Sequence, residues 1–278
     1  MKRDIERAEI LGFCMGVRRA VAMVYEALHS DTPKPVYTFG PIIHNNSVIK
    51  DLREKGVVSI DSPEDASGTV IIRAHGISPD LRKELQEKGI ELLDATCPRV
   101  LHSQEKVKEF CGRGYRILIA GDRDHGEVRG LAGYCGNCRI IGTQEEAETV
   151  QIPPKSMIIA QTTFSPELFQ EIVDILRKRL PDLAVVNSIC PATEKRQEAL
   201  KQLCRRNDAI LVIGGKNSAN TRRLFETARK LCPASWHIEN AEEIPNEVYH
   251  FTRIGLSAGA STPDWVIDEV EKKLRNID

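Results

Sequence analysis

The sequence lacks several features that would assign it to a common class of protein. No run approaches the roughly 20 consecutive apolar residues that a membrane-spanning helix needs, and residues 1–7 lack the apolar segment of a signal peptide. Like charges form no block, and 39 Lys and Arg nearly balance 40 Asp and Glu. Because neither a nucleic-acid surface nor a membrane-binding face is indicated, we expect a cytoplasmic globular protein whose partners are small molecules.

Two nucleotide-binding signatures are also missing. The stretch Gly214-Gly215-Lys216-Asn217-Ser218 loosely resembles a phosphate loop, but the spacing of a Walker motif is absent. No Rossmann glycine fingerprint precedes an acidic ribose-binding residue. The sequence therefore predicts neither nucleotide hydrolysis nor a tightly bound nicotinamide.

A threefold internal repeat is the main feature that the sequence does contain. Cys97-Pro98 and Cys190-Pro191 lie 93 positions apart, and the same offset carries the apolar run 117–121 onto 210–214. With a two-residue adjustment in a loop, residues 36–40 match the same run. Such self-similarity indicates repeated supersecondary units.

Each repeat predicts strands that alternate with helices. A second apolar run in each repeat leads to a hydroxyl residue, a proline and an acid, which is typical of a helix N-terminus. Continuous apolar runs rather than alternating ones favour parallel sheets covered by helices on both faces. We expect three small α/β domains at residues 1–95, 96–188 and 189–278, with the opening segment as the first strand of domain one and the helix at 265–275 packing back to close the structure.

Three cysteines occupy matching positions, after an apolar run and before a helix: Cys14, Cys97 and Cys190. Ligands of parallel α/β domains bind beyond the carboxyl ends of the strands, and three domains about a pseudo-threefold axis would bring the three thiolates together. Three cysteines would leave one iron of a four-iron cluster open to substrate. A zinc ion with three protein ligands and a water is the second hypothesis, and three buried core cysteines are the third.

The other five cysteines indicate less. Eight cysteines in a reducing compartment favour metal sites, redox chemistry or burial over a disulfide framework. Cys111 and Cys204 share one helical position and are predicted to lie in the core. Cys135 and Cys138 form a Cys-x-x-Cys pair without a second pair at metal spacing, and Cys232 is predicted to be structural.

Polar residues cluster in the loops that follow the strands. In repeat register His44, His125 and Ser218 are equivalent, and other strand ends add His75, Thr162 and Ser261. Hydrogen-bond donors beside helix N-termini favour anions, so a diphosphate would fit such a ring. Glu127 stands where the other repeats have Asn46 and Asn220, and a carboxylate near a bound diphosphate favours its protonated form, which suits a proton donor.

At these residues the sequence strongly resembles the LytB family of 4-hydroxy-3-methylbut-2-enyl diphosphate reductases, over essentially the whole chain. The resemblance is carried by nine short motifs: Gly12-Phe13-Cys14-Met15-Gly16-Val17, Gly40-Pro41-Ile42-Ile43-His44-Asn45, Arg73-Ala74-His75-Gly76, Asp94-Ala95-Thr96-Cys97-Pro98, His125-Gly126-Glu127-Val128, Gln161-Thr162-Thr163, Ile189-Cys190-Pro191-Ala192-Thr193, Asn217-Ser218-Ala219-Asn220-Thr221 and Ala258-Gly259-Ala260-Ser261.

The resemblance implies a trefoil of three α/β domains around a central [4Fe-4S] cluster held by Cys14, Cys97 and Cys190. It implies reductive dehydroxylation of the diphosphate to isopentenyl and dimethylallyl diphosphate, the last step of the non-mevalonate pathway, with a ferredoxin or flavodoxin as electron donor. Thr162 and Glu127 would handle the substrate hydroxyl and its protons. The implied diphosphate ligands are His44, His75, His125, Ser218, Asn220 and Ser261.

Three positions depart from the family pattern. The family usually has proline where Gly126 stands, and glycine at this position would loosen the loop that carries Glu127. Many members have serine where Ala219 stands. The pair Cys135 and Cys138 is not part of the family pattern. Two other functions remain open from the residues alone: a zinc hydrolase that acts on a phosphorylated compound, and a non-catalytic protein that binds a diphosphate or senses a metal.

Overall fold

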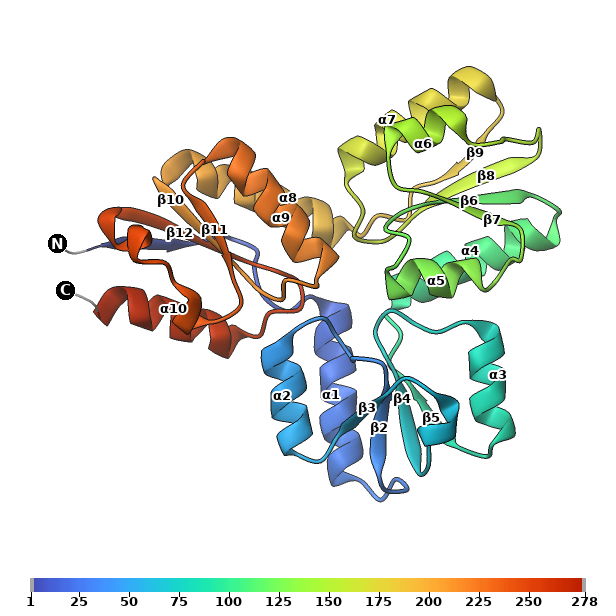
Figure 1. Cartoon of the computed structure of the whole chain (residues 1–278), viewed down its shortest axis with the longest axis horizontal. Helices are drawn as coiled ribbons and strands as arrows, with labels where there is room; N and C mark the ends of the chain where they lie inside the picture. The colour runs from blue at the N-terminus through green and yellow to red at the C-terminus, as the bar shows by residue number, and fades with distance from the viewer. Residues whose placement is uncertain (1–2, 277–278) are drawn as a thin grey trace. The chain divides into compact units, whose positions relative to one another are not determined.

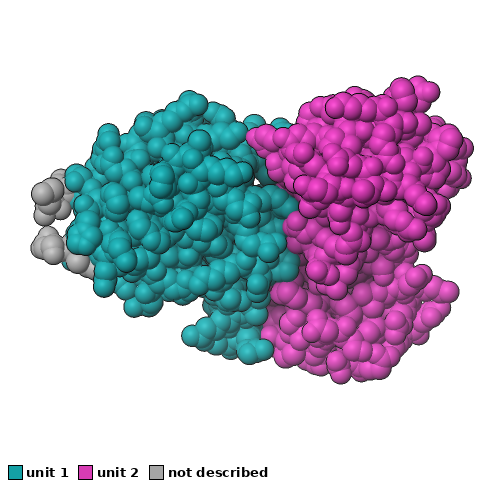
Figure 2. All heavy atoms as spheres, turned by 45° about the horizontal axis from the view of Figure 1, so that its top comes forward, with its two compact units in different colours: residues 1–18, 43–55, 191–278 teal, residues 19–42, 56–190 magenta. Residues whose placement is uncertain are grey.

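A computed structural model describes residues 3–276 of the chain, which form two compact units. Among these residues, unit 1 comprises 3–18, Ile43–Lys55 and 191–276, and unit 2 comprises Arg19–Ile42 and Gly56–Cys190. Figure 2 colours the two units separately. Each unit therefore combines segments that are not continuous in sequence.

Unit 1 contains one parallel sheet of four strands, in the order β1-β12-β10-β11 (Figure 1). Its strands are β1 (Asp4–Arg7), β10 (Ala209–Ile213), β11 (Ser235–Ile238) and β12 (Arg253–Ala258). Its helices are α2 (Asn46–Glu54), α8 (Pro191–Arg206), α9 (Ala219–Leu231), α10 (Asp264–Asn276) and the short 3₁₀ turns η2 (Ala241–Glu243) and η3 (Asn246–His250).

Helices cover both faces of this sheet. Successive side chains of a strand point to opposite faces, so alternate residues of β10 pack in two different apolar clusters. Leu211 and Ile213 of β10 pack in one apolar cluster with Val266 of α10. Ile210 and Val212 pack in another cluster, which contains residues of α8 and α9. The continuous apolar sequence of β10 thus reflects burial on both sides.

Unit 2 contains two further parallel sheets of four strands, in the orders β3-β2-β4-β5 and β7-β6-β8-β9. The strands of the first are β2 (Val36–Phe39), β3 (Val58–Ile60), β4 (Thr69–Ile72) and β5 (Glu91–Asp94). Those of the second are β6 (Arg116–Ala120), β7 (Cys138–Ile141), β8 (Ser156–Ala160) and β9 (Ala184–Val186). The helices are η1 (Pro63–Asp65), α3 (Pro79–Glu87), α4 (Pro98–Gly112), α5 (Gly126–Ala132), α6 (Gln144–Thr149), α7 (Pro166–Arg179) and most of α1 (Met15–His29).

The three sheets share one strand order. When the sheet of unit 1 is read from β11 to β1, β1 takes the place that β5 and β9 take in the other two. Each of these three strands precedes one of the matching cysteines. Three small parallel sheets, each built from strands that alternate with helices, confirm the predicted α/β fold class.

One expectation for the start of the chain is wrong. The opening segment is not the first strand of a domain at 1–95, because β1 pairs with β12 near the other end of the sequence. The pairing continues past β1 to Ala8, whose N–H donates to Leu256 O at 2.8 Å.

The predicted helix starts at Ser-Pro are confirmed. Ser78 and Ser165 accept hydrogen bonds from the N–H groups of Leu81 and Leu168, with proline in the first turn of α3 and α7. Thr262 differs, because its hydroxyl donates to Ile213 O at 2.9 Å and so ties the start of α10 to β10. Among the described residues, no helix is long and apolar enough to cross a membrane.

Candidate functional site

The three matching cysteines occupy equivalent places, each directly before a helix, and all are half-buried. The N–H of each donates to a carbonyl just beyond the neighbouring strand. Cys14 donates to Ala260 at 3.1 Å in unit 1, while Cys97 donates to Ala74 at 3.0 Å and Cys190 to Thr162 at 2.8 Å in unit 2. The same backbone hydrogen bond thus recurs in all three repeats and fixes the position of each cysteine backbone beside the neighbouring strand.

The segment before Cys97 is held by two arginines that the sequence analysis did not single out. Arg19 of α1 donates to Thr96 O at 3.1 Å and to Asp94 O at 3.2 Å. The Asp94 carboxylate accepts from Thr96 N at 2.9 Å and pairs with Arg82. Burial raises the pKa of Asp94, but the hydrogen bonds from Thr96 and Arg82 outweigh it, so the pKa is lower than usual.

The segment before Cys190 is held by its own side chains. Asn187 Oδ1 accepts from Ile189 N at 3.1 Å, and Ser188 Oγ accepts from Ala160 N at 3.1 Å. The Ser188 hydroxyl also donates to the carbonyl of Ala160, so it bridges both backbone groups of the residue that ends β8. The signal in the sequence was the polar pair between an apolar strand and the Cys-Pro dipeptide, which is typical of side chains that cap a backbone turn.

The segment before Cys14 depends on a glycine. Gly12 has φ +75°, a conformation that side chains with a Cβ rarely adopt. A Cβ at this position would lie 3.0 Å from Asp264 Oδ1 and 3.4 Å from Thr262 O. The chain therefore needs glycine where it turns from β1 towards Cys14.

Glu127 and Thr162 form a buried pair in unit 2. Glu127 is 1% exposed, and its Oε1 accepts from Thr162 N at 2.7 Å while Oε2 accepts from the Thr162 hydroxyl at 2.8 Å. Because the Thr162 carbonyl accepts from Cys190 N, the pair is fixed to the backbone of that cysteine. A buried carboxylate bonded to a hydroxyl can hold or pass on a proton.

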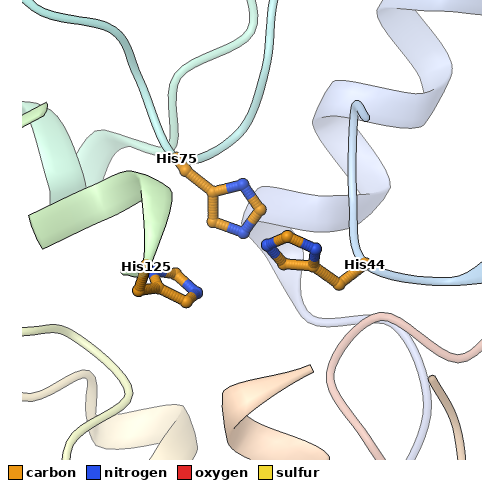
Figure 3. A group of neighbouring side chains, drawn as sticks. All are labelled: His44, His75 and His125. Carbon is orange, nitrogen blue, oxygen red and sulfur yellow. The ribbon is translucent and has the colours of Figure 1, made fainter. Parts of the chain in front are cut away.

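His125, two residues before Glu127, contacts His75 in unit 2. Their rings meet edge to face, with centroids 5.0 Å apart (Figure 3). His125 Nδ1 also accepts from Glu127 N at 3.2 Å and so caps α5. Gly126 between them is buried, and a Cβ there would lie 2.9 Å from the Arg73 guanidinium, so the glycine that departs from the family pattern is packed against Arg73.

Four predicted diphosphate ligands lie in unit 1, including His44, which Figure 3 also labels. The Ser261 hydroxyl donates to His44 O at 3.1 Å, and Ser218 Oγ accepts from Thr221 N at 3.3 Å as the cap of α9. Asn220 is 5% exposed, and its Nδ2 is buried without a hydrogen-bond partner among the described residues. A buried N–H donor at a helix N-terminus is suited to an anionic ligand.

The cysteines outside this set include one disulfide, contrary to our expectation. Cys111 of α4 is bonded to Cys135, and their Cα atoms are 5.9 Å apart. Cys138 stays a thiol that donates to Cys135 O at 2.9 Å, and burial raises its pKa to about 11. Cys204 is buried, as predicted, and Cys232 is buried as well. The Cys-x-x-Cys spacing gave no sign that Cys135 would pair with a helix 24 residues earlier.

The fold and these residues together define a class: a parallel α/β protein with three repeated sheets, a thiol beyond a strand of each, and polar side chains at neighbouring strand ends. Residues 5–275 match the family described as LytB protein. The chain belongs to this family, as its motifs predicted.

Named relatives agree over nearly the full length. A protein of Treponema denticola is 47% identical over 285 residues, which cover 97% of this chain and 98% of the relative. One of Aquifex aeolicus is 41% identical over 280 residues, covering 99% and 96%. Both are named 4-hydroxy-3-methylbut-2-enyl diphosphate reductase.

Two solved structures have the same fold. One is a (E)-4-hydroxy-3-methyl-but-2-enyl diphosphate reductase, described as the terminal enzyme of the non-mevalonate pathway; it is 41% identical with a TM-score of 0.73 and covers 99% of this chain and 100% of its own. The other is the E-1-hydroxy-2-methyl-but-2-enyl-4-diphosphate reductase of Plasmodium falciparum, 28% identical with a TM-score of 0.91, covering 98% and 87%.

Proposed function

We propose that this protein is the 4-hydroxy-3-methylbut-2-enyl diphosphate reductase of the non-mevalonate isoprenoid pathway. The observation that carries the proposal is the recurrence of one hydrogen-bonded cysteine in all three repeats of a LytB-family chain. The reaction replaces the allylic hydroxyl with hydrogen. It consumes two electrons and two protons, releases water, and yields isopentenyl or dimethylallyl diphosphate according to which carbon is protonated.

The donor set fits an iron–sulfur cluster of the [4Fe-4S] type. Three half-buried cysteines, each directly before a helix, offer the sulfur ligands that such a cluster takes. Cys14, Cys97 and Cys190 would hold the cluster. When bound, it supplies electrons and, with only three cysteine ligands, an iron that is open to the substrate oxygen.

The polar side chains at the strand ends would bind the diphosphate. The donors in unit 1 are His44, Ser218, Asn220 and Ser261, and those in unit 2 are His75 and His125. The buried Nδ2 of Asn220 at the start of α9 supports this assignment, since such a donor is costly to leave unpaired. Imidazole, hydroxyl and amide groups together donate several hydrogen bonds to phosphate oxygens.

Glu127 and Thr162 would handle the protons. The Thr162 hydroxyl already donates to the Glu127 carboxylate at 2.8 Å, so a proton that reaches the carboxylate can pass to an oxygen bonded to Thr162. Burial excludes bulk water from Glu127, which limits proton delivery to this route. The pair would therefore protonate the departing hydroxyl.

Three further assignments belong to the same proposal. We infer that a ferredoxin or flavodoxin supplies the electrons and that the protein works in the cytoplasm. We also propose three domains with boundaries near residues 95 and 188, the first strand of the chain belonging with the last domain.

Anaerobic purification tests the proposal against its rivals. We expect a brown protein with about four irons and four sulfides per chain, which reduces the substrate when a chemical reductant is supplied. A colourless protein with a single zinc would instead support a hydrolase of phosphorylated compounds. An iron–sulfur protein that binds the diphosphate but does not reduce it would support a sensor.

A further inference from the structure

A buried arginine that the proposed reaction does not use lies beside the Cys14 segment. Arg196 is on α8 in unit 1, and it is 2% exposed. Its Nη2 donates to Gly12 O at 2.6 Å and its Nε donates to Ala258 O at 3.2 Å. Nη1 makes a longer bond of 3.4 Å to Ala192 O, one turn earlier on the same helix.

These carbonyls mark the two segments that meet at Cys14. Gly12 precedes Cys14 by two residues, and Ala258 is the last residue of β12. Two residues past Ala258, the carbonyl of Ala260 accepts the hydrogen bond from Cys14 N. Arg196 thus links the end of β12, which leads to the acceptor Ala260, with the segment that leads to the donor Cys14.

The chemistry of the guanidinium suits this position. Its donors lie in a fixed plane, so one side chain can bond two carbonyls at a set separation. Taking a guanidinium out of water costs free energy unless its donors are hydrogen-bonded. Because Arg196 is buried, a shift of the Gly12 or Ala258 carbonyl out of hydrogen-bonding distance would destabilise the protein. Lysine has a compact ammonium on a flexible stem and cannot reproduce the planar geometry.

We propose that Arg196 is a positioning residue for Cys14: it holds the Gly12 and Ala258 carbonyls so that the Cys14 thiol is presented in one orientation. The proposal rests on the function above, in which Cys14 is a cluster ligand. No signal in the sequence indicated that Arg196 is buried, since arginines in highly charged helices are usually exposed to solvent.

The test compares Arg196→Gln and Arg196→Lys with Arg206→Gln, a control on the same helix whose side chain is 56% exposed and pairs with Glu6. Each full-length protein is purified anaerobically and treated with iodoacetamide below its unfolding temperature. Labelling of Cys14, Cys97 and Cys190 is followed by peptide mass spectrometry on the full-length protein after its metal has been removed anaerobically with a chelator, so that a bound metal protects none of the three thiols. The time for cluster loss to the chelator is recorded separately on the protein as purified.

We expect Arg196→Gln to speed the labelling of Cys14 by about tenfold, a moderate effect for two lost charge-assisted hydrogen bonds, while Cys97 and Cys190 keep their rates. Arg196→Lys should fall between wild type and Gln, and cluster loss should follow the same order. Arg206→Gln should match the wild type. The contrast among cysteines is one that general destabilisation would not produce.

An unchanged Cys14 rate, or an equal rise at all three cysteines, would overturn the proposal. If Arg196→Gln does not fold, the same comparison is decided by Arg196→Lys. Should the wild-type protein contain no cluster, the proposed function fails, yet the labelling contrast still reports whether Arg196 positions Cys14. The two failures are therefore distinguishable.

Discussion

Glu127 combines near-complete burial with two hydrogen bonds from one residue, and this pairing makes its proposed role as proton donor directly testable. Replacement by glutamine keeps an oxygen that can accept from Thr162 N but removes the ionisable group. We expect Glu127→Gln to reduce turnover at least about 100-fold, the lower range for a lost proton-transfer group, with iron content and substrate affinity little changed.

Steady-state kinetics with a chemical reductant, together with iron analysis, measure this effect. The matched control is Glu171→Gln, which removes an exposed carboxylate of α7 that bonds only Gln144 among the described residues. Near-normal turnover in Glu127→Gln would remove Glu127 from the proton path.

Asp94 links pH to the stability of the Cys97 segment. Its folded pKa is lower than its unfolded pKa, which is about 3.9, so its contribution is present above that pH and is lost as the pH falls through the folded value. We expect Asp94→Asn to lower the free energy of unfolding by about 1–2 kcal/mol at pH 7, the range for a hydrogen bond to a charged group.

Denaturant unfolding at pH 7 and at pH 3 checks both parts of this prediction. The gap between wild type and Asp94→Asn should narrow at pH 3, which lies below the unfolded pKa, because the unfolded state there binds the proton more than the folded state does. A gap that is constant across this range would contradict an electrostatic role for the carboxylate.

At the level of elements, the disulfide joins α4 to the turn that follows α5, and both helices begin beside proposed site residues. α4 starts directly after Cys97 and ends near Cys111, while Cys135 follows α5, whose first turn contains Glu127. Because a covalent link restricts the unfolded chain, we expect Cys111→Ser to lower the free energy of unfolding by about 3 kcal/mol under non-reducing conditions.

A dithiol reductant should reduce the wild-type stability to that of Cys111→Ser and leave the variant unchanged. Cys138→Ser is the control, since that thiol is not bonded and its raised pKa keeps it protonated at neutral pH. Equal unfolding curves for reduced and oxidised wild type would show that the bond contributes nothing.

The elements also show what the sequence could and could not predict. Helix starts at Ser78 and Ser165 were predictable because the cap, the proline and the acid are local signals. β1 was misplaced since pairing with β12 depends on residues about 250 positions away, which local apolarity does not report. The Cys111–Cys135 bond and the burial of Arg196 were unpredictable for the same reason: both depend on how separate elements pack.

At the level of the whole molecule, the sheet of unit 1 combines β1, near the start of the chain, with β12, near its end. Ile5 of β1 is buried in the same cluster as Val270 of α10, and it pairs with Ile254. We expect Ile5→Ala to cost about 2–4 kcal/mol, the usual range for a large apolar residue in a core. Amide hydrogen exchange should rise in β12 and stay unchanged in β4 and β8.

The control for this substitution is Val58→Ala on β3, where the side chain is 48% exposed. It should leave exchange in β12 unaltered. Faster exchange in all three sheets of Ile5→Ala would mean that the sheets unfold together and that β1 has no local role.

The hydrogen bond from Cys14 to Ala260 has a consequence for synthesis on the ribosome. Cys14 is the first of the three thiols to be translated, but the strand and carbonyl that fix it are among the last parts of the chain to appear. The partners of Cys97 and Cys190 precede them in the sequence and are ready much earlier. A nascent chain can thus order two thiols during translation, and insertion of the proposed cluster, which would need all three, would follow only when translation is nearly finished.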